Sequence, residues 1–268
     1  MESKNRNVWI IVVAVLVVAC CCVLAVAAGA VGWLTGRYAE IGYEPFDLGG
    51  LYRERIEKTF EVGDAPSLDI TNFAGSVTLR SGESGVVRVV ATKKASSRSR
   101  LDRIEVSVTE RDGRVVIKAE ESFSRSNVSV DLEITAPAGS RVDVDLKAGE
   151  VDVRDITSRI DIHNGAGTVD VRGARGTARV QVGAGQITYE GVPGGDCRFE
   201  IGVGEIILRL PTDLNVEVDA STGIGAVDVD FHVDGRVAVR NVEGVIGDGG
   251  QGSIYAHTGA GSVSVKRR

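Results

Sequence analysis

The chain has 268 residues and a net charge of −6 at pH 7, and it combines 34 glycines with only 5 prolines and 5% aromatic residues. Acidic and basic residues are interspersed, so the chain lacks the basic stripe that drives phosphate binding, and we expect no nucleic-acid partner. The many Val, Ile and Thr residues favour β-structure with glycine turns and argue against a helical bundle.

An uncharged, apolar segment covers residues 8–34. As a helix rising ~1.5 Å per residue it would be about 40 Å long, which exceeds the ~30 Å hydrocarbon core of a bilayer. Trp9 and Trp33 lie near its two ends, where indole rings favour the headgroup boundary, and Lys4 and Arg6 precede it. We therefore predict a single-pass protein of the cell membrane that is held by this helix, with its large C-terminal part outside the cytoplasm.

Three of the four cysteines, Cys20 to Cys22, lie inside this segment, so the even count predicts no disulfide framework. Two alternatives to a retained helix stay open. Small residues at 27–30 suit cleavage of a signal peptide, and Cys20 loosely fits the lipidation pattern of bacterial lipoproteins. The apolar run is longer than the ~7–15 residues of a signal-peptide core, which favours retention. Cys197 is flanked by strand residues and is expected to be buried.

Residues 35–58 carry glycines and charges that are typical of a membrane-proximal linker, with one short helix expected at 51–58. From Thr59 onward, short segments alternate apolar and polar residues with the period of a half-buried strand. These segments are 59–62, 67–70, 76–79, 86–90, 104–108, 115–117 and 128–134. Only the Ser- and Arg-rich stretch 94–103 interrupts them, and it is expected to form a loop or a short surface helix.

The second half repeats the tripeptide Gly-x-Gly, which begins at residues 165, 183, 202, 223 and 259. The steps are 18, 19, 21 and 36 residues, and we interpret the last step as two repeats whose middle tripeptide is missing. An alternating apolar run flanks each tripeptide, so the unit is strand, glycine corner, strand and second corner. Glycine suits the corners because it adopts positive φ without a Cβ clash and lets stacked backbones approach closely.

Two architectures fit this unit. In a single-stranded β-solenoid, similar to a β-helix, each repeat is one coil, and the apolar side chains of successive coils form a continuous core. In a β-meander or sandwich, each Gly-x-Gly would instead be a hairpin turn. The constant length and apolar phase of the repeats favour the solenoid. We therefore predict an all-β repeat domain preceded by one N-terminal transmembrane helix.

This domain contains several short motifs: Phe60-Glu-Val-Gly at its start, Gly75-Ser-Val-Thr-Leu, a central Ile134-Thr-Ala-Pro-Ala-Gly, and repeated units such as Gly167-Thr-Val-Asp-Val. In these motifs the run from Thr59 to Arg268 resembles the bacterial putative-adhesin domain family, a family of unknown function. The resemblance implies a β-solenoid-like envelope protein, and it brings no catalytic residues. The expected organisation is a cytoplasmic tail at 1–7, a transmembrane helix at 8–34, a linker at 35–58 and an adhesin-like β-repeat domain at 59–268.

Outward-facing aspartates occupy equivalent points in the repeats, at Asp152, Asp170 and Asp228. If strands stack ~4.8 Å apart, Asp152 and Asp170 are neighbours whose like charges repel. A Ca²⁺ ion would relieve this repulsion. Arg154 and Arg172, two positions along, favour instead a solvated, charge-balanced face, and whether calcium binds stays open.

The remaining motifs give no support to cofactor or catalytic chemistry. No Gly-x-Gly continues to a third glycine or opens a helix, as a nucleotide site requires. The three histidines, His163, His232 and His257, lack metal-ligand spacing, and no Gly-x-Ser-x-Gly elbow is present. We therefore predict no catalytic, cofactor-binding or metal-binding residues.

The resulting hypothesis is a non-enzymatic binding or adhesion scaffold at the cell envelope, whose partner is a cell-wall glycan or another envelope protein. The first alternative is an accessory protein for envelope stress or signalling. The second is a polysaccharide-active β-helix enzyme with paired carboxylates. The even spread of acidic residues and the scarcity of aromatic side chains disfavour this enzyme.

Overall fold

A computed structural model of the chain describes residues 52–122 and 127–268. These residues belong to one compact unit that starts at Leu51. The predicted tail 1–7, the predicted span 8–34 and most of the linker 35–58 lie outside the described residues. Within the described part of the chain, no helix has both the length and the apolar character needed to span a bilayer.

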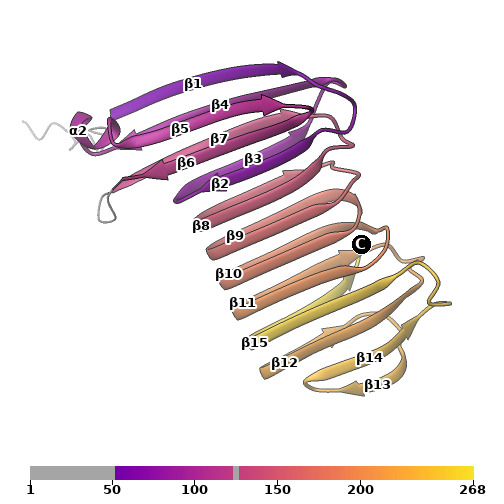
Figure 1. Ribbon diagram of the computed structural model, residues 1–268. Coiled ribbons are helices and arrows are strands. Elements are labelled where there is room, and N and C mark those ends of the chain that lie inside the picture. Colours follow the sequence, from indigo (N-terminus) through magenta and orange to yellow (C-terminus); the bar gives the residue numbers. More distant parts are fainter. Residues whose placement is uncertain (1–51, 123–126) are drawn as a thin grey trace, which may run out of the picture. The chain divides into compact units, whose positions relative to one another are not determined.

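The described residues are almost entirely β-structure, as the composition predicts, and their strands join into one 15-stranded sheet (Figure 1). The elements in order are β1 (Tyr52–Glu61), β2 (Ser67–Asn72), β3 (Gly75–Ser81), β4 (Val86–Ala95), α2 (Arg98–Leu101), β5 (Ile104–Arg111), β6 (Arg114–Glu121), β7 (Val128–Ala136), β8 (Arg141–Arg154), β9 (Ile160–Gly176), β10 (Ala178–Pro193), β11 (Cys197–Leu210), β12 (Val216–Val229), β13 (Asp234–Ala238), β14 (Asn241–Ile246) and β15 (Ser253–Arg267). Every strand segment predicted in the first half coincides with one of them, except that Val62 lies one residue beyond β1. The stretch 94–103, expected to form a loop or a short surface helix, contains the end of β4 and then α2.

The helix predicted at 51–58 is wrong, because residues 52–58 belong to β1. This strand pairs antiparallel with β4 along its whole length, from Tyr52 opposite Ala95 to Glu61 opposite Val86. Nearly all of its side chains are exposed and many are charged, so the sequence lacks the apolar alternation that marks a strand. Pairing with β4 decides its conformation. The strand structure thus begins N-terminal to Thr59.

Six strands form a parallel stack in the order β8, β9, β10, β11, β15 and β12. Each strand bends at its Gly-x-Gly, or at Lys147-Ala-Gly149 in β8, and we call the parts before and after this corner the first arm and the second arm. Both arms pair in register with the same arm of the next strand. Because the pairing is parallel, the alternative of a hairpin turn at each Gly-x-Gly is wrong.

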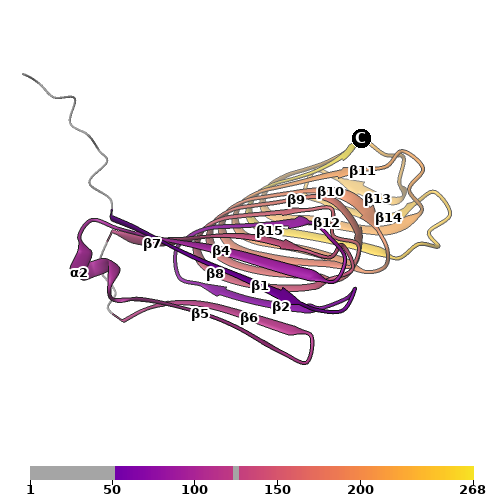
Figure 2. The same cartoon turned by 90° about the horizontal axis from the view of Figure 1, so that it is seen from above.

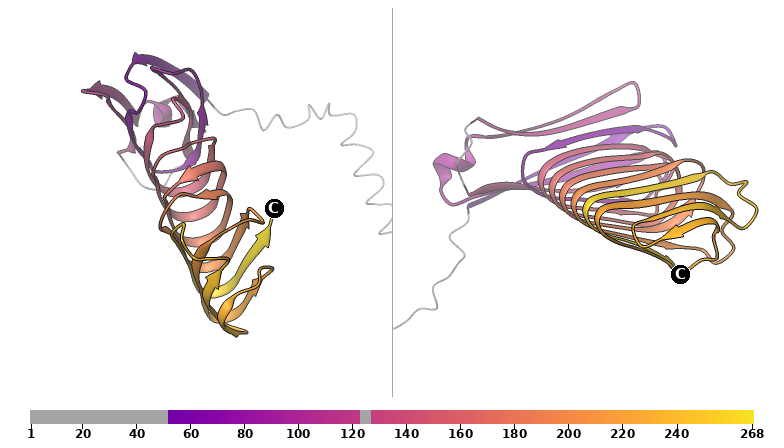
Figure 3. Two further views of the ribbon diagram at one scale, coloured as in Figure 1. Left: turned by 90° about the vertical axis from the view of Figure 1, so that its right-hand side faces the viewer. Right: turned by 90° about the horizontal axis from the view of Figure 1, so that it is seen from below.

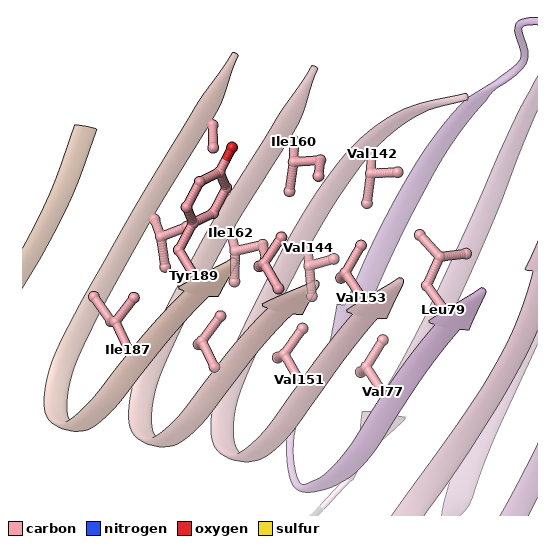
Figure 4. Close-up of a cluster of buried hydrophobic side chains, with 14 of the residues drawn as sticks. Val77, Leu79, Val142, Val144, Val151, Val153, Ile160, Ile162, Ile187 and Tyr189 are labelled. Atoms are coloured by element: carbon pink, nitrogen blue, oxygen red, sulfur yellow. The ribbon is translucent and has the colours of Figure 1, made fainter. Parts of the chain in front are cut away.

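The core lies between the two arms (Figure 4). In β9, for example, Ile160 and Ile162 of the first arm and Val169 and Val171 of the second arm are all buried. The same apolar positions recur in each neighbouring strand, so the side chains form one continuous cluster along the stack. Burying each such side chain contributes roughly 1.5–3 kcal/mol, and only stacking on a neighbour makes this burial complete.

Toward β1 the two arms continue as two separate layers. The first arm of β8 pairs with β2, and its second arm pairs with β3, so that β2 and β3 act as the arms of one more repeat with its corner at Gly75. Beyond them, β6 and β5 extend the first layer while β7, β4 and β1 extend the second. The two layers are seen apart in Figure 2.

The second glycine of each corner is fixed by backbone geometry. These glycines have φ values between +135° and +142° in the stack, a region that L side chains rarely adopt. A Cβ on Gly185 would also overlap the carbonyl oxygen of Gly167 in the preceding strand. The same overlap would occur at each corner of the stack, so the glycines form a column along which the backbones are in close contact.

The interpretation of the 36-residue step as two successive repeats is wrong. After β12 the chain forms the antiparallel hairpin β13–β14 beyond the end of the stack, and β15 then returns to lie between β11 and β12 (Figure 1, Figure 3). Gly261 of β15 accordingly stacks between Gly204 and Gly225. The periodicity could not reveal this because an inserted strand and a following strand have the same repeat pattern.

The glycine column makes a specific prediction for Gly185→Ala. The new Cβ would be strained at this φ and would displace the Gly167 backbone, so we expect a loss of about 2–5 kcal/mol in the free energy of unfolding, measured by urea denaturation. Gly63→Ala is the matched control, since nothing lies within 4 Å of a Cβ at Gly63. Equal stability of the two variants would contradict the close packing at the corner.

The position of β15 makes a second prediction. Removing residues 253–268 would uncover the paired edges and buried side chains of β11 and β12. We expect amide hydrogen exchange to show lost protection throughout residues 216–246, while β8 to β10 stay protected by one another. Unchanged protection of residues 216–246 would show that β12 does not need β15 to join the stack, and would contradict the insertion of β15 between β11 and β12.

Candidate binding surface

The outward side chains of the parallel stack form regular rows. Since neighbouring strands pair in register, equivalent residues on successive strands lie next to each other, ~4.8 Å apart. One set of rows covers the outer face of the first arms and another covers the outer face of the second arms. Both faces extend over all six strands of the stack.

On the second-arm face, the predicted neighbours Asp152 and Asp170 are confirmed as a register pair. Each carboxylate is held by the arginine two residues along its own strand. The Nη2 of Arg154 donates to Oδ2 of Asp152 at 2.7 Å, and Arg172 bonds Asp170 in the same way. The two arginines therefore neutralise the charges of the two aspartates on this face, as the sequence predicted.

Asp228 lies in the same row but is separated from Asp170. The intervening positions are Thr188, Ile207 and Ser264, the last because β15 is inserted before β12. Across the described residues, no group of three or more His, Cys, Asp or Glu side chains is placed to hold a metal ion.

The first-arm face carries an acidic row that the sequence analysis missed. Asp69 of β2, Asp143 of β8 and Asp161 of β9 are consecutive register partners. Arg114 pairs with Asp69 and Arg159 pairs with Asp161, one at each end of the row. Alternation places each aspartate outward, but Asp69 is 74 residues from Asp143 in the chain, so only the strand order brings the three together.

The middle carboxyl of this row is the perturbed one. Desolvation among its neighbours, followed by repulsion from the carboxylates of Asp161, Asp69 and Asp145, raises the pKa of Asp143 above its ordinary value. Arg159 acts in the opposite direction but more weakly. The ionised form of Asp143 is therefore less favourable in the folded chain than in the unfolded chain.

The sign of the charge in this row changes between β9 and β10. Asp161 is followed by Arg179 of β10 and then by Arg198 of β11, with Tyr255 of β15 next in register. A cleft of about 350 Å³ lies over these strands. We call it the basic cleft, and its lining consists of Arg159, Asp161, Thr177, Ala178, Arg179, Asp196, Cys197, Arg198, Ser253 and Tyr255.

The histidines do not come together, in line with their spacing in the sequence. Nδ1 of His163 lies 3.1 Å from Oε1 of Gln181, and Nδ1 of His257 lies 3.0 Å from Oγ of Ser221. His232 is exposed. Cys197 is buried as predicted. This burial raises the pKa of its thiol, so less of the reactive thiolate forms at a given pH.

No family model matches the chain, and no curated protein matches it. Several solved structures are similar to it. One is a putative cell adhesion protein from Clostridium sporogenes, with 17% identity and a TM-score of 0.47 over 80% of this chain and 100% of that one. Another is a putative adhesin from Bacteroides fragilis, with 14% identity and a TM-score of 0.42 over 80% of this chain and 97% of that one.

A third is a putative lipid binding protein from Parabacteroides distasonis, with 7% identity and a TM-score of 0.37 over 79% of this chain and 96% of that one. The first two of these structures are named as a cell adhesion protein and an adhesin. Because all of these TM-scores lie below 0.5, the function proposed below depends on the residues of this chain.

The raised pKa of Asp143 gives a prediction with a definite sign. Above the raised pKa the charged carboxylate weakens the fold. This cost shrinks as the pH falls through the raised pKa and is gone well below 3.8, the ordinary value, where the group is protonated in both states. Asp143→Asn should therefore raise the melting temperature at pH 7 and have no effect at a pH well below 3.8. The gain should stay under about 1 kcal/mol because the side chain is exposed.

Asp152→Asn is the control for Asp143→Asn, because it removes an ion-paired carboxylate from the other face. It should not raise the melting temperature at pH 7. A lower melting temperature for Asp143→Asn at pH 7 would mean that this carboxylate accepts a stabilising interaction and would overturn the account of the acidic row.

Proposed function

We propose that this protein is a non-enzymatic scaffold for binding or adhesion at the cell envelope, built as a β-solenoid and held at the membrane by residues 8–34. The observation that carries the proposal is the in-register arrangement of outward polar side chains on the two arm faces. A surface that repeats at the spacing of strands suits a partner that also repeats, such as a glycan chain or another β-edge.

The strength of such a surface lies in its rigidity. Its side chains project from paired strands over a continuous core, so little conformational entropy is lost when a partner binds. Several of them are already fixed by ion pairs within one strand, as in Arg154 with Asp152 and Arg172 with Asp170. Exposed ion pairs of this kind contribute little to the stability of the fold. A partner could therefore exchange contacts with these side chains at little cost in folding stability.

One observation favours a second candidate, a polysaccharide-active enzyme. A carboxyl with a raised pKa beside ionised carboxylates is the arrangement of an acid and base pair in glycoside hydrolysis, and Asp143 stands between Asp69 and Asp161 in this way. Both of these neighbours are, however, engaged by arginines, so neither is a free nucleophile or base. Binding therefore remains the preferred function.

A binding assay with an exchanged anchor tests this proposal. The full chain and a variant with residues 8–34 replaced by an unrelated membrane segment are incubated with envelope fragments and purified cell-wall sacculi. We expect both proteins to retain the same partner, since the strand faces carry the binding. Retention only with the native segment would instead support the signalling-accessory alternative, in which the membrane segment makes the contact.

The same incubations are followed for release of reducing sugar ends. Turnover that is abolished by Asp143→Asn would contradict the non-enzymatic proposal and establish the acidic row as catalytic. Binding without turnover, unchanged by Asp143→Asn, is the result that we expect.

A further inference from the structure

The basic cleft joins four successive strands of the stack. Its arginines come from the residue before β9, from β10 and from β11, and its far side is formed by Ser253 and Tyr255 of β15. It thus extends along the stack axis over three strand spacings of ~4.8 Å. Its volume of about 350 Å³ lies within the range of small-ligand sites, roughly 300–1,000 Å³.

Arg179 is the arginine of this cleft whose guanidinium N–H groups have no acceptor among the described residues. Its side chain is exposed, and among the described residues no group accepts a hydrogen bond from it or forms an ion pair with it. Asp161, its register partner on β9, is already used by Arg159, which donates from Nη2 to Oδ1 at 3.2 Å and from Nε to Oδ2. The guanidinium of Arg179 therefore presents its fork of donors to solvent.

The arginine on the next strand is held in place by its surroundings. The Nη1 of Arg198 donates to Oε1 of Glu200 at 3.0 Å, and its Cζ lies 4.3 Å from the ring centroid of Tyr255. Glu200 is itself fixed through its other oxygen, which accepts from Nε2 of Gln181 at 2.7 Å. The remaining donors of Arg198 are thereby preorganised beside Arg179.

The acidic residues of the lining do not compete strongly for these donors. Asp161 is engaged by Arg159, and Asp196 accepts from Oγ of Ser253 at 2.9 Å. A planar carboxylate matches the parallel donors of a guanidinium better than any neutral group does. The cleft is thus built for an oxyanion, even though the chain as a whole is acidic.

The shape and lining of the cleft favour a sugar chain over a lipid as the carrier of that anion. Its apolar members, Ala178 and Cys197, are both buried, so they offer no surface to an acyl chain. The hydroxyl groups of Thr177, Ser253 and Tyr255 border the arginines and match the hydroxyl groups of a sugar. A linear chain along the stack axis would meet one strand after another.

We infer that the basic cleft binds an acidic polysaccharide through a carboxylate that is received by Arg179 and flanked by Arg198. This inference rests on the proposed binding function and names the class of its ligand. Arg179 supplies the charged fork, Arg198 a second cation in fixed orientation, and the neighbouring hydroxyl groups hydrogen bonds to the sugar.

Polygalacturonate is the probe that tests the cleft. The full chain, kept in a mild detergent because of its apolar segment, is titrated by calorimetry with polygalacturonate, with neutral dextran and with mixed micelles of phosphatidylglycerol in the same detergent. We expect binding that depends on Arg179 for polygalacturonate alone, weakened by added salt. Arg179→Ala should reduce its affinity roughly 10- to 100-fold, as the loss of a charge-assisted pair does.

Two further variants make the result specific. Arg209→Ala removes the same charge from the second-arm face of β11 and should leave the affinity unchanged. Arg179→Lys keeps the charge but loses the fork, so its affinity should fall between those of the wild type and Arg179→Ala. Equal binding of dextran, or equal losses for Arg179→Ala and Arg209→Ala, would overturn the inference.

The other outcomes separate this inference from the proposed function. Retention on cell-wall sacculi without any binding of polygalacturonate would reject the cleft as the site while the binding function stands. Binding of the phosphatidylglycerol micelles that requires Arg179 would replace the glycan with a lipid headgroup. Failure on polygalacturonate, sacculi and envelope fragments together would reject both the cleft and the proposed function.

Discussion

The close contact of backbones at the glycine column is the constraint on which the rest of the stack depends. At these corners there is no room for a Cβ, because each would overlap the carbonyl oxygen of the strand before it. This contact keeps successive strands in one register, and the register in turn places apolar residues over apolar residues between the arms. A shift by one residue would turn every buried Val and Ile outward, so corner and core support the same arrangement.

The same register builds the outer faces, and so the surface chemistry is a consequence of the fold. Residues 18 or 19 positions apart become neighbours in successive strands of the stack. The pattern of charge on each face therefore depends on which strands pair and not on the order of residues along the chain. Three aspartates from β2, β8 and β9 form the acidic row in this way, and the row turns basic at Arg179. The perturbed Asp143 and the unpaired Arg179 stand on either side of this change, two strands apart.

The edges of the sheet are protected by different means. At one end the two layers finish in β5 and β1, and the exposed charges of β1, among them Arg53, Glu54 and Lys58, discourage pairing with another chain. At the other end the edge is β13, which has only five residues. The inserted β15 belongs to this second end, because it joins β12 and its hairpin to the remainder of the stack and supplies Tyr255 to the basic cleft.

The sequence by itself determined the all-β class, the strand segments, the glycine corners and the charge balance of Asp152 with Arg154, because these depend on local alternation and on spacings within one repeat. Only the tertiary structure decided three other features. Antiparallel pairing with β4 made residues 52–58 a strand, although their charges hide any alternation. The place of β15 between β11 and β12, and the meeting of Asp69 with Asp143, depend on which strands pair. Strand order is set by the packing of the whole core over long sequence separations, and a repeating pattern is equally compatible with several orders.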